Sequence, residues 1–396
     1  MNPIAKRIAE MTSRVQQVQE EGFYFYLQSI EALNGARVMV KGRGEMLMFA
    51  SYSYLNLIGH PKIDAAAKAA IDEFSSGTHG VRVLAGTTRL HDELEEKIAA
   101  FNGAEAAIVF SSGYVTNLAT VSTLVGRGDV VICDKLNHAS IVDGCLMSRA
   151  QFVRFRHNDM ADLEKRLAQV KPEAGKLVIV DAVFSMDGDI INLPEVNRLS
   201  KKYGALLMVD EAHSLGVLGE TGHGIEEHFG LENEVDIHMG TLSKTIPSVG
   251  GYIAADQDTI TYLKHAARAF VFSAALPPAA VAAAKASFEV IEEEPERRLA
   301  VQRNIKHFLS GLKARGFDTM QSETAIVPIV CGEDEKALMM AKLAQDEGIF
   351  VLPIVPPAVP HGTSRLRANV TAAHSEEDID YALDVFERAG KAVGVI

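Results

Sequence analysis

The segment Gly240-Thr241-Leu242-Ser243-Lys244 lies between an apolar stretch, Val235 to Met239, and the glycine pair Gly250-Gly251. The apolar stretch predicts a buried strand, so Lys244 follows the end of that strand beside two hydroxyl groups. A lysine in this setting is desolvated enough to act as a nucleophile, and the nearby hydroxyls and glycines suit the approach of a phosphate. Many lysines simply extend from strand ends into solvent, and this short segment alone does not separate the two interpretations.

A second segment, Leu206-Leu207-Met208-Val209-Asp210-Glu211-Ala212-His213-Ser214, is an apolar strand that ends in an acid. A buried parallel strand delivers such a side chain at its carboxyl end, where Asp210 can keep a ring nitrogen protonated and His213 can reach a ring oxygen. Together with Lys244, these groups match the needs of pyridoxal phosphate (PLP): an amine for a Schiff base, an acid at the ring nitrogen and an anchor for the phosphate. The alternative for Asp210 is a helix N-cap after the strand.

The composition is that of an ordinary globular protein. Of the 396 residues, 47% are hydrophobic and 23% are charged, which is enough for one large and one small domain. The net charge of −13 argues against nucleic acid as a partner. The three cysteines form no CxxC pair, and no apolar run reaches the ~20 residues of a membrane helix. With no secretory signal at the N-terminus, we expect a cytoplasmic protein without an integral membrane segment.

Strands and helices alternate through the middle of the chain, which predicts an α/β fold around a mainly parallel sheet with helices on both faces. The predicted strands are 106–110, 130–133, 151–155, 176–180, 205–209, 235–239 and 251–254. Before them, residues 1–30 predict a helix that ends in the aromatic residues Phe23 to Tyr26, followed by a hairpin at 38–49.

After Pro278 we expect one long helix that continues to Leu312, then a small α+β domain with strands at 325–330, 349–351 and 365–370 and a closing helix at 376–385. The expected division is an N-terminal arm at 1–55, a large domain at 56–290 and a small C-terminal domain at 291–396.

A phosphate site is predicted where Phe110-Ser111-Ser112-Gly113-Tyr114-Val115-Thr116-Asn117 follows a strand and begins a helix. Backbone N–H groups at a helix start, with a glycine that permits close approach, bind phosphate well. Ser-Gly pairs are also common at ordinary strand–helix turns. Tyr114 can lie near a planar ring or pack in the core, and the sequence leaves both open.

Three further segments with candidate site residues lie after or within predicted strands. His138, in Asn137-His138-Ala139-Ser140, can stack on a heteroaromatic ring and donate a proton to a substrate carbonyl, although lone histidines are often structural. Ser185 can hydrogen-bond a ring oxygen. In the C-terminal strand Arg365-Leu366-Arg367, an arginine fork suits the carboxylate of an amino acid, and a surface arginine is the alternative.

In combination these motifs resemble the α-oxoamine synthases, a family of fold-type I PLP enzymes. The resemblance extends from Tyr52 to about Asp380. Its motifs here are Ser112-Gly113-Tyr114, Asn137-His138-Ala139-Ser140, Asp210-Glu211-Ala212-His213-Ser214, Gly240-Thr241-Leu242-Ser243-Lys244, and Arg365-Leu366-Arg367 before Thr371-Ala372-Ala373-His374. The resemblance implies a fold-type I PLP transferase with a large, mainly parallel α/β domain, a small α+β C-terminal domain and an N-terminal arm.

The resemblance also implies a role for each motif toward PLP. Lys244 would form the Schiff base, Asp210 would pair with the pyridine nitrogen, and His138 would stack on the ring. Ser185 and His213 would contact the phenolic oxygen. The phosphate and its surroundings would be held by Ser112, Gly113, Tyr114, Thr241, Ser243 and, from a second subunit, Ser273. Because the family's active sites form at a dimer interface, a homodimer is implied.

Substrate contacts are implied at three positions. Arg367 would hold the carboxylate of the amino acid, near Ser53, where the family carries asparagine. Val81, in a glycine-rich loop, would limit the amino acid to a small side chain. Where 5-aminolevulinate synthases place an arginine for the succinyl carboxylate, this chain has Phe23-Tyr24-Phe25-Tyr26. These departures favour an uncharged aliphatic acyl chain.

The function we expect is a decarboxylative condensation of serine, alanine or glycine with an acyl thioester of coenzyme A or acyl carrier protein, most like serine palmitoyltransferase. Within the family, 8-amino-7-oxononanoate synthase and 2-amino-3-ketobutyrate ligase are alternatives. An aminotransferase would share Lys244 and Asp210 but make a keto acid, and a non-catalytic partner subunit would not need Lys244. No metal is assigned. The amino acid, the acyl length and the carrier stay open.

Overall fold

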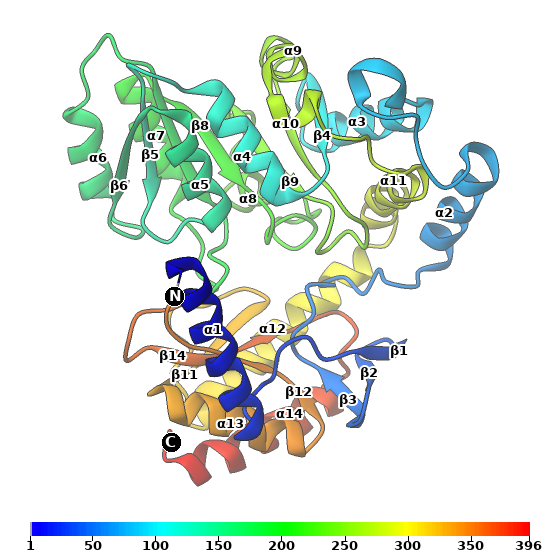
Figure 1. The fold of residues 1–396 in the computed structure, drawn as a ribbon, viewed down its shortest axis with the longest axis vertical. Coiled ribbons are helices and arrows are strands. Elements are labelled where there is room, and N and C mark those ends of the chain that lie inside the picture. The colour runs from blue at the N-terminus through cyan, green and yellow to red at the C-terminus, as the bar shows by residue number, and fades with distance from the viewer. Residues whose placement is uncertain (1) are drawn as a thin grey trace. The chain divides into compact units, whose positions relative to one another are not determined.

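The computed structural model describes residues 2–396, which divide into two compact units (Figure 1). One unit is Tyr52–Gln302, and the other combines the residues up to Ser51 with Arg303–Ile396. The expected N-terminal arm and most of the expected C-terminal domain therefore contribute to the same unit. Within residues 2–396, every helix is too short or too polar to cross a bilayer.

The larger unit is built on a seven-stranded sheet in the order β4-β10-β9-β8-β7-β5-β6. Its strands are β4 (Ala106–Phe110), β5 (Val130–Asp134), β6 (Gln151–Phe155), β7 (Lys176–Asp181), β8 (Leu206–Asp210), β9 (Ile237–Thr241) and β10 (Gly251–Ala255). From β9 to β6 all neighbours are parallel, whereas β10 is antiparallel to both β4 and β9. The predicted mainly parallel α/β fold is confirmed.

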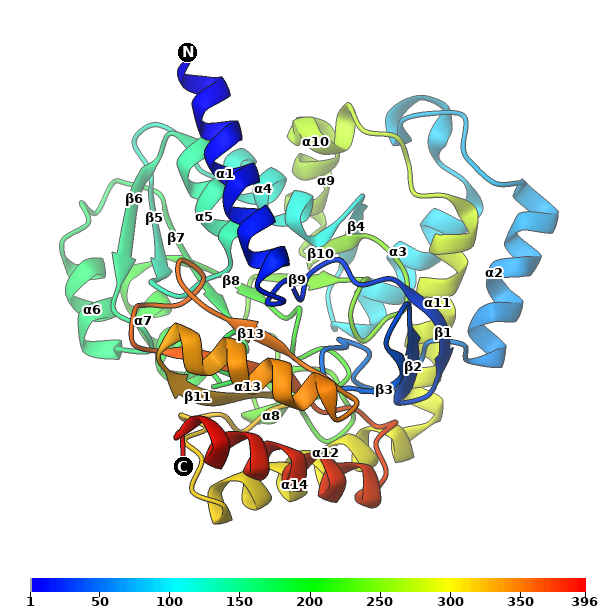
Figure 2. The same ribbon diagram turned by 60° about the horizontal axis from the view of Figure 1, so that its bottom comes forward.

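Helices cover both faces of this sheet. The helices are α2 (Pro61–Phe74), α3 (Arg89–Phe101), α4 (Gly113–Leu124), α5 (Ala139–Ser148), α6 (Met160–Ala168), α7 (Leu193–Tyr203), α8 (Ile225–His228), α9 (Gln257–Ala266), α10 (Arg268–Val271) and α11 (Pro278–Glu293), with a π-helical turn at Arg82–Gly86. Side chains of α4, α5, α9 and α10 share one apolar core with the sheet. Figure 2 shows α6 and α7 on the side opposite α4 and α5. Because both faces are covered, strands such as β5 and β10 are buried along their whole length.

The register of the parallel strands sets where the polar side chains meet. Asp181, the last residue of β7, pairs with Asp210, the last residue of β8, and Asp210 pairs in turn with Met239 of β9. The carboxyl ends of three neighbouring strands therefore lie side by side. In open α/β sheets, ligands bind at this edge.

The smaller unit contains two sheets. One has the order β1-β2-β3-β12, and the other is antiparallel with the order β11-β14-β13. The strands are β1 (Ile30–Asn34), β2 (Arg37–Val40), β3 (Gly44–Met48), β11 (Ile326–Gly332), β12 (Ile349–Phe350), β13 (Leu352–Ile354) and β14 (Ser364–Asn369); the helices are α1 (Pro3–Glu20), α13 (Asp334–Asp346) and α14 (Glu376–Val393), with the greater part of α12 (Pro295–Ala314). Figure 2 shows α13 running along the antiparallel sheet with α14 beside it.

Several predicted boundaries were wrong. The single long helix expected after Pro278 is two helices, because Pro295 lacks an N–H group and its ring hinders the preceding turn, so α11 ends and α12 begins there. The first helix ends at Glu20, since Gly22 adopts a positive φ of 76°. The predicted strand 349–351 is two short strands in different sheets. Strand β1 was missed because all its side chains are exposed and show no alternation.

Candidate active site

A cavity of about 270 Å³ lies in the Tyr52–Gln302 unit, where the carboxyl ends of β7, β8 and β9 meet. The predicted site residues among its lining are Ser112, Gly113, Tyr114, His138, Ser185, Asp210, His213, Thr241, Ser243 and Lys244. The rest of the lining is Asn117, Ser140, Asp181, Val183, Ala212 and Met239. Residues from five separate segments of the sequence thus enclose one space.

Asp210 is held by two donors. Its Oδ2 accepts a hydrogen bond from Nδ2 of Asn117 at 2.7 Å, and its Oδ1 accepts one from the backbone N–H of Ala212 at 2.9 Å. Hydrogen bonds to a carboxylate favour its charged form. After β8 the next helix is α8, which begins at Ile225, so Asp210 is not an N-cap and that alternative is wrong. The strand end places a fixed anion in the cavity.

Asp181 lies beside Asp210 and differs from it in charge. Full burial, together with the neighbouring charge of Asp210, holds the pKa of Asp181 well above its usual range. Its Oδ2 accepts a hydrogen bond from the backbone N–H of His138 at 3.1 Å. Two adjacent buried carboxylates cannot both ionise cheaply, and the raised pKa makes Asp181 the one that favours its protonated form. Asp181 was not predicted, although it ends a strand in the same way as Asp210.

Lys244 points into the cavity, and the solvent-exposed alternative is wrong. Its Nζ lies 2.8 Å from Nε2 of His213 and 5.7 Å from the centre of the Tyr52 ring. The other nitrogen of His213, Nδ1, lies 2.7 Å from the hydroxyl of Tyr54. Lysine, histidine and tyrosine therefore form one chain of hydrogen bonds.

His138 caps the N-terminus of α5. Its Nδ1 accepts a hydrogen bond from the backbone N–H of Ser140 at 3.3 Å and lies 2.7 Å from Oγ of the same residue. An accepting Nδ1 places the proton of the neutral ring on Nε2. Burial lowers the pKa of His138, and the charge of Asp210 opposes that shift. A neutral ring with an N–H group is therefore available beside Asp210, and the edge of Tyr114 lies against it at 6.4 Å between ring centres.

The start of α4 forms a cradle for an anion. Ser112 is its N-cap, and Oγ of Ser112 accepts a hydrogen bond from the backbone N–H of Val115 at 3.2 Å. The N–H groups of Gly113 and Tyr114, the first two residues of the helix, have no carbonyl of the same helix to bond. A Cβ on Gly113 would lie only 2.9 Å from Oγ1 of Thr241, so glycine is needed there. The Thr241 hydroxyl lies 2.9 Å from that of Ser243. Positive dipole, hydroxyls and close backbone approach together suit a phosphate.

Four predicted residues are not part of this cavity lining. Ser273 and Val81 lie in the same unit, where Val81 forms a bridge with Ala274, and Ser53 is buried there as well. Arg367 lies on β14 in the other unit, and both it and Arg365 are buried, so the surface alternative is wrong. The roles of these four residues stay predictions.

Besides Asp181, two polar residues of the lining had no predicted role, and these are Asn117 and Ser140. Asn117 Nδ2 also donates to Oγ of Ser140 at 3.0 Å, so one amide links Asp210 to the residue that orients His138. Both residues fall inside segments that the sequence singles out, but a single sequence holds no signal for such a contact. It depends on α4 and α5 packing against each other.

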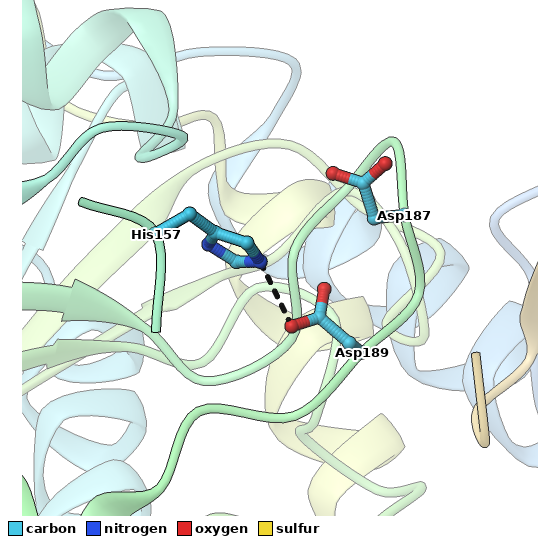
Figure 3. Close-up of side chains that lie close together, drawn as sticks. All are labelled: His157, Asp187 and Asp189. Atoms are coloured by element: carbon cyan, nitrogen blue, oxygen red, sulfur yellow. Dashed lines mark hydrogen bonds and ion pairs between the residues drawn. The ribbon is translucent and has the colours of Figure 1, made fainter. Parts of the chain in front are cut away.

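A second charged cluster lies outside the cavity, at His157 (Figure 3). Its Nδ1 lies 3.1 Å from Oδ1 of Asp134, and its Nε2 lies 3.0 Å from Oδ2 of Asp189, with Asp187 nearby. Burial alone would lower the pKa of His157, but the hydrogen bonds to the two aspartates raise it to about 10. Because a proton on Nε2 occupies the position that a metal would need, we interpret the cluster as an ion bridge between the segments that follow three strands.

Comparison with known proteins identifies relatives over the whole chain. The sequence model of the family described as aminotransferase class I and II matches residues 44–386. An 8-amino-7-oxononanoate synthase of Geobacter sulfurreducens is 45% identical over 98% of this chain and 99% of the relative. A serine palmitoyltransferase of Bacteroides thetaiotaomicron is 44% identical over 96% of each.

Solved structures show the same fold. A serine palmitoyltransferase from S. paucimobilis with a bound PLP-myriocin aldimine superposes with a TM-score of 0.96 at 38% identity and covers 100% of both chains. An 8-amino-7-oxononanoate synthase from Francisella tularensis gives a TM-score of 0.77 at 26% identity, covering 89% of this chain and 99% of the other.

Proposed function

Because the chain belongs to the aminotransferase class I and II family and, within it, to the α-oxoamine synthases, we propose that the cavity around Lys244 joins a small amino acid to an acyl thioester. The predicted family, acyltransferase class and cofactor are confirmed: the chain is a PLP-dependent α-oxoamine synthase. For this enzyme we propose the substrates and the role of each residue in the cavity.

The groups of the cavity fit PLP. When bound, PLP withdraws electrons from the Cα atom of the amino acid. Lys244 Nζ is the amine that would bind it, and the anionic Asp210 would face its ring nitrogen. The helix start at Gly113 would receive the phosphate, where a Cβ would fill the space. The other residues assigned to its ring and phosphate are His138, Ser185, His213, Ser112, Tyr114, Thr241 and Ser243.

The proton movements follow from the protein's own groups. Lys244 Nζ, as a neutral amine, takes the proton from Cα. A bond then forms between Cα and the acyl carbon while the C–S bond breaks and the thiolate leaves. The bond between Cα and the carboxylate breaks to release carbon dioxide, and Lys244 returns a proton to Cα to give an α-amino ketone. His138, neutral with its proton on Nε2, donates a hydrogen bond to the thioester oxygen as that oxygen gains charge. Asp181 keeps its proton, so Asp210 remains the anion throughout.

For the substrates we propose serine, alanine or glycine with an uncharged acyl thioester, as in serine palmitoyltransferase. The higher structural similarity to that enzyme, with a TM-score of 0.96 against 0.77, supports this choice, whereas sequence identity hardly separates the two relatives. Arg367 is proposed to hold the amino acid's carboxylate and Ser53 to lie near it, and Val81 to restrict its side chain. The second candidate, 8-amino-7-oxononanoate synthase activity, would require a donor whose far end carries a carboxylate.

We also propose that the enzyme is a cytoplasmic homodimer in which Ser273 of the partner subunit completes the phosphate site. The three cysteines Cys133, Cys145 and Cys331 are all buried and form no disulfide, which supports a reducing compartment. Sedimentation and cross-linking of the purified protein test the dimer.

The observation that carries the proposed function is the meeting of Lys244, Asp210, His138 and the α4 cradle in one cavity. The test incubates the PLP-loaded protein with serine, alanine or glycine and with the palmitoyl, octanoyl, acetyl, pimeloyl or succinyl thioester. Free thiol, carbon dioxide and the α-amino ketone are then measured, the last by mass spectrometry. Stoichiometric release of all three supports the proposal. A keto acid formed without a thioester would identify an aminotransferase, and no product from any pair would indicate a non-catalytic subunit.

A further inference from the structure

Tyr54 is not among the residues that line the active cavity, but it is hydrogen-bonded to one that is. It lies between β3 and α2, its side chain is 0% exposed, and its hydroxyl is 2.7 Å from Nδ1 of His213. On the far side of the same ring, Nε2 lies 2.8 Å from Nζ of Lys244. A tyrosine fixed in the interior is thus linked through one imidazole to the reactive amine.

We propose that Tyr54 is a positioning residue that holds His213 in the tautomer with its proton on Nε2 and thereby favours the neutral, nucleophilic form of Lys244. The inference rests on the proposed function, since it gives a role to the amine assigned there. Nothing in the sequence assigned a role to Tyr54, which is separated from His213 by 159 positions.

The two hydrogen bonds can run in only two consistent directions. In one, the tyrosine O–H donates to Nδ1, so the proton of the neutral ring lies on Nε2 and donates to Nζ. An amine accepts only when it is neutral, because an ammonium group has no lone pair. In the other, the lysine donates to Nε2, which either form of its amine can do, and Nδ1–H donates to the tyrosine oxygen. Only the first direction requires a neutral Lys244.

Tyr54 shifts the balance between these arrangements. A phenol with an ordinary pKa of ~10 is a better donor to imidazole than an acceptor from it, so the buried hydroxyl favours the direction in which Lys244 is neutral. The Tyr52 ring, 5.7 Å from Nζ, favours the ammonium form instead. The other titratable residues of the cavity lining, besides Lys244 and His213, are Tyr114, His138, Asp181 and Asp210, and a substitution at Tyr54 leaves these side chains in place.

For function, the consequence is that His213 directs a hydrogen-bond donor into the cavity. With its proton on Nε2, His213 presents an N–H group to whatever lies next to Lys244, which suits the phenolic oxygen assigned to it. Without the tyrosine hydroxyl the imidazole is free to hold its proton on Nδ1 and to accept from a charged lysine. Both the tautomer and the charge of the amine then move away from the reactive state.

The test begins with the cofactor-free protein, so that it does not depend on turnover. The variant Tyr54→Phe removes the hydroxyl and keeps the ring, and Tyr252→Phe is the matched control. Tyr252 is equally buried, and its hydroxyl lies 3.5 Å from the side chain of Asn102, away from His213. Acylation of Lys244, followed by isotope-ratio mass spectrometry, gives the pH at which its reaction rate is half the maximum; this pH is the Lys244 midpoint. Nitrogen NMR of protein with labelled histidine gives the tautomer of His213.

We expect the Lys244 midpoint in Tyr54→Phe to rise by about 0.4–1 pH unit, the equivalent of one neutral hydrogen bond, while Tyr252→Phe matches the wild type. The Nδ1 resonance of His213 should move toward the protonated position. In a His213→Gln background, Tyr54→Phe should produce no further shift, because the link is already broken. An unchanged midpoint and unchanged tautomer in folded Tyr54→Phe would overturn the proposal.

The PLP-loaded enzyme supplies an independent reading. There kcat of Tyr54→Phe should fall roughly three- to tenfold, with the acid limb of its pH profile displaced upward and KM for the amino acid unchanged. A loss confined to KM, or one shared by Tyr252→Phe, would show a merely structural role. If the wild type forms no product, the proposed function fails while the cofactor-free measurements still decide the role of Tyr54.

Discussion

The substitution Gly251→Ala tests whether the helix start at α4 binds the cofactor phosphate. Gly251 lies on β10, directly beneath the first residue of α4. A Cβ built there would lie 2.7 Å from Cα of Gly113 and 2.4 Å from Oγ1 of Thr116. The backbone at Gly251 has a conformation that alanine adopts readily, so the effect comes from the added methyl group alone.

The magnitude follows from these distances. The contact with Gly113 Cα is 0.7 Å below the 3.4 Å at which ordinary contact begins, and it involves backbone that cannot rotate away. The start of α4 must therefore move outward by a comparable amount. Overpacking of this kind costs about 1–3 kcal/mol of stability. Loss of one hydrogen bond to the charged phosphate, at about 1.5–3 kcal/mol, would raise the Kd for PLP roughly ten- to a hundredfold.

The assay is titration of the cofactor-free protein with PLP, followed by absorbance, alongside thermal unfolding. Gly126→Ala is the matched control, because Gly126 follows the other end of α4 and a Cβ there meets no atom within 4 Å. The control should keep the wild-type Kd. If Gly251→Ala bound PLP within twofold of the control, the cradle would not be the phosphate site.

Four further outcomes are expected. Lys244→Ala should lose product formation by ~10²–10⁴-fold or more in the thiol-release assay, since the base at Cα is gone; retained turnover would refute its role. Asp210→Asn should still bind PLP in the absorbance titration but lose most of its activity, because an amide cannot keep the ring nitrogen protonated; near-normal rates would leave Asp210 a purely structural residue. Because folding raises the pKa of His157 from 6.5 to about 10, its bridge stabilises the protein fully below pH 6.5 and this stabilisation is lost as the pH rises through 10. The difference in Tm between wild type and His157→Gln should therefore shrink over that range, and a constant difference would contradict the ion bridge. In a competition assay at equal concentrations, palmitoyl or octanoyl thioesters should outperform pimeloyl and succinyl ones, because the aromatic segment 23–26 offers apolar surface where an arginine would be expected for a second carboxylate; a win for either diacid would overturn that reasoning.

Much of the site could be predicted because the chemistry sits at strand ends. Asp210 and Lys244 each follow an apolar run, and such runs become parallel strands whose carboxyl ends face a common edge. Gly113 begins a helix after a strand, which is a local pattern that a sequence displays directly. The break at Pro295 was also visible in the sequence and was overlooked in favour of a continuous helix.

The remaining features depend on contacts between distant segments. The pKa of Asp181 is raised by its burial and by Asp210, which the register of β7 against β8 places beside it. Asn117 supports Asp210 across 93 positions, and Tyr54 supports His213 across 159. The sequence by itself indicated which residues meet in the cavity, since strand and helix periodicity are local. Only the tertiary structure decided their protonation and their supporting partners, because charge and hydrogen bonding depend on distances that the folded chain alone creates.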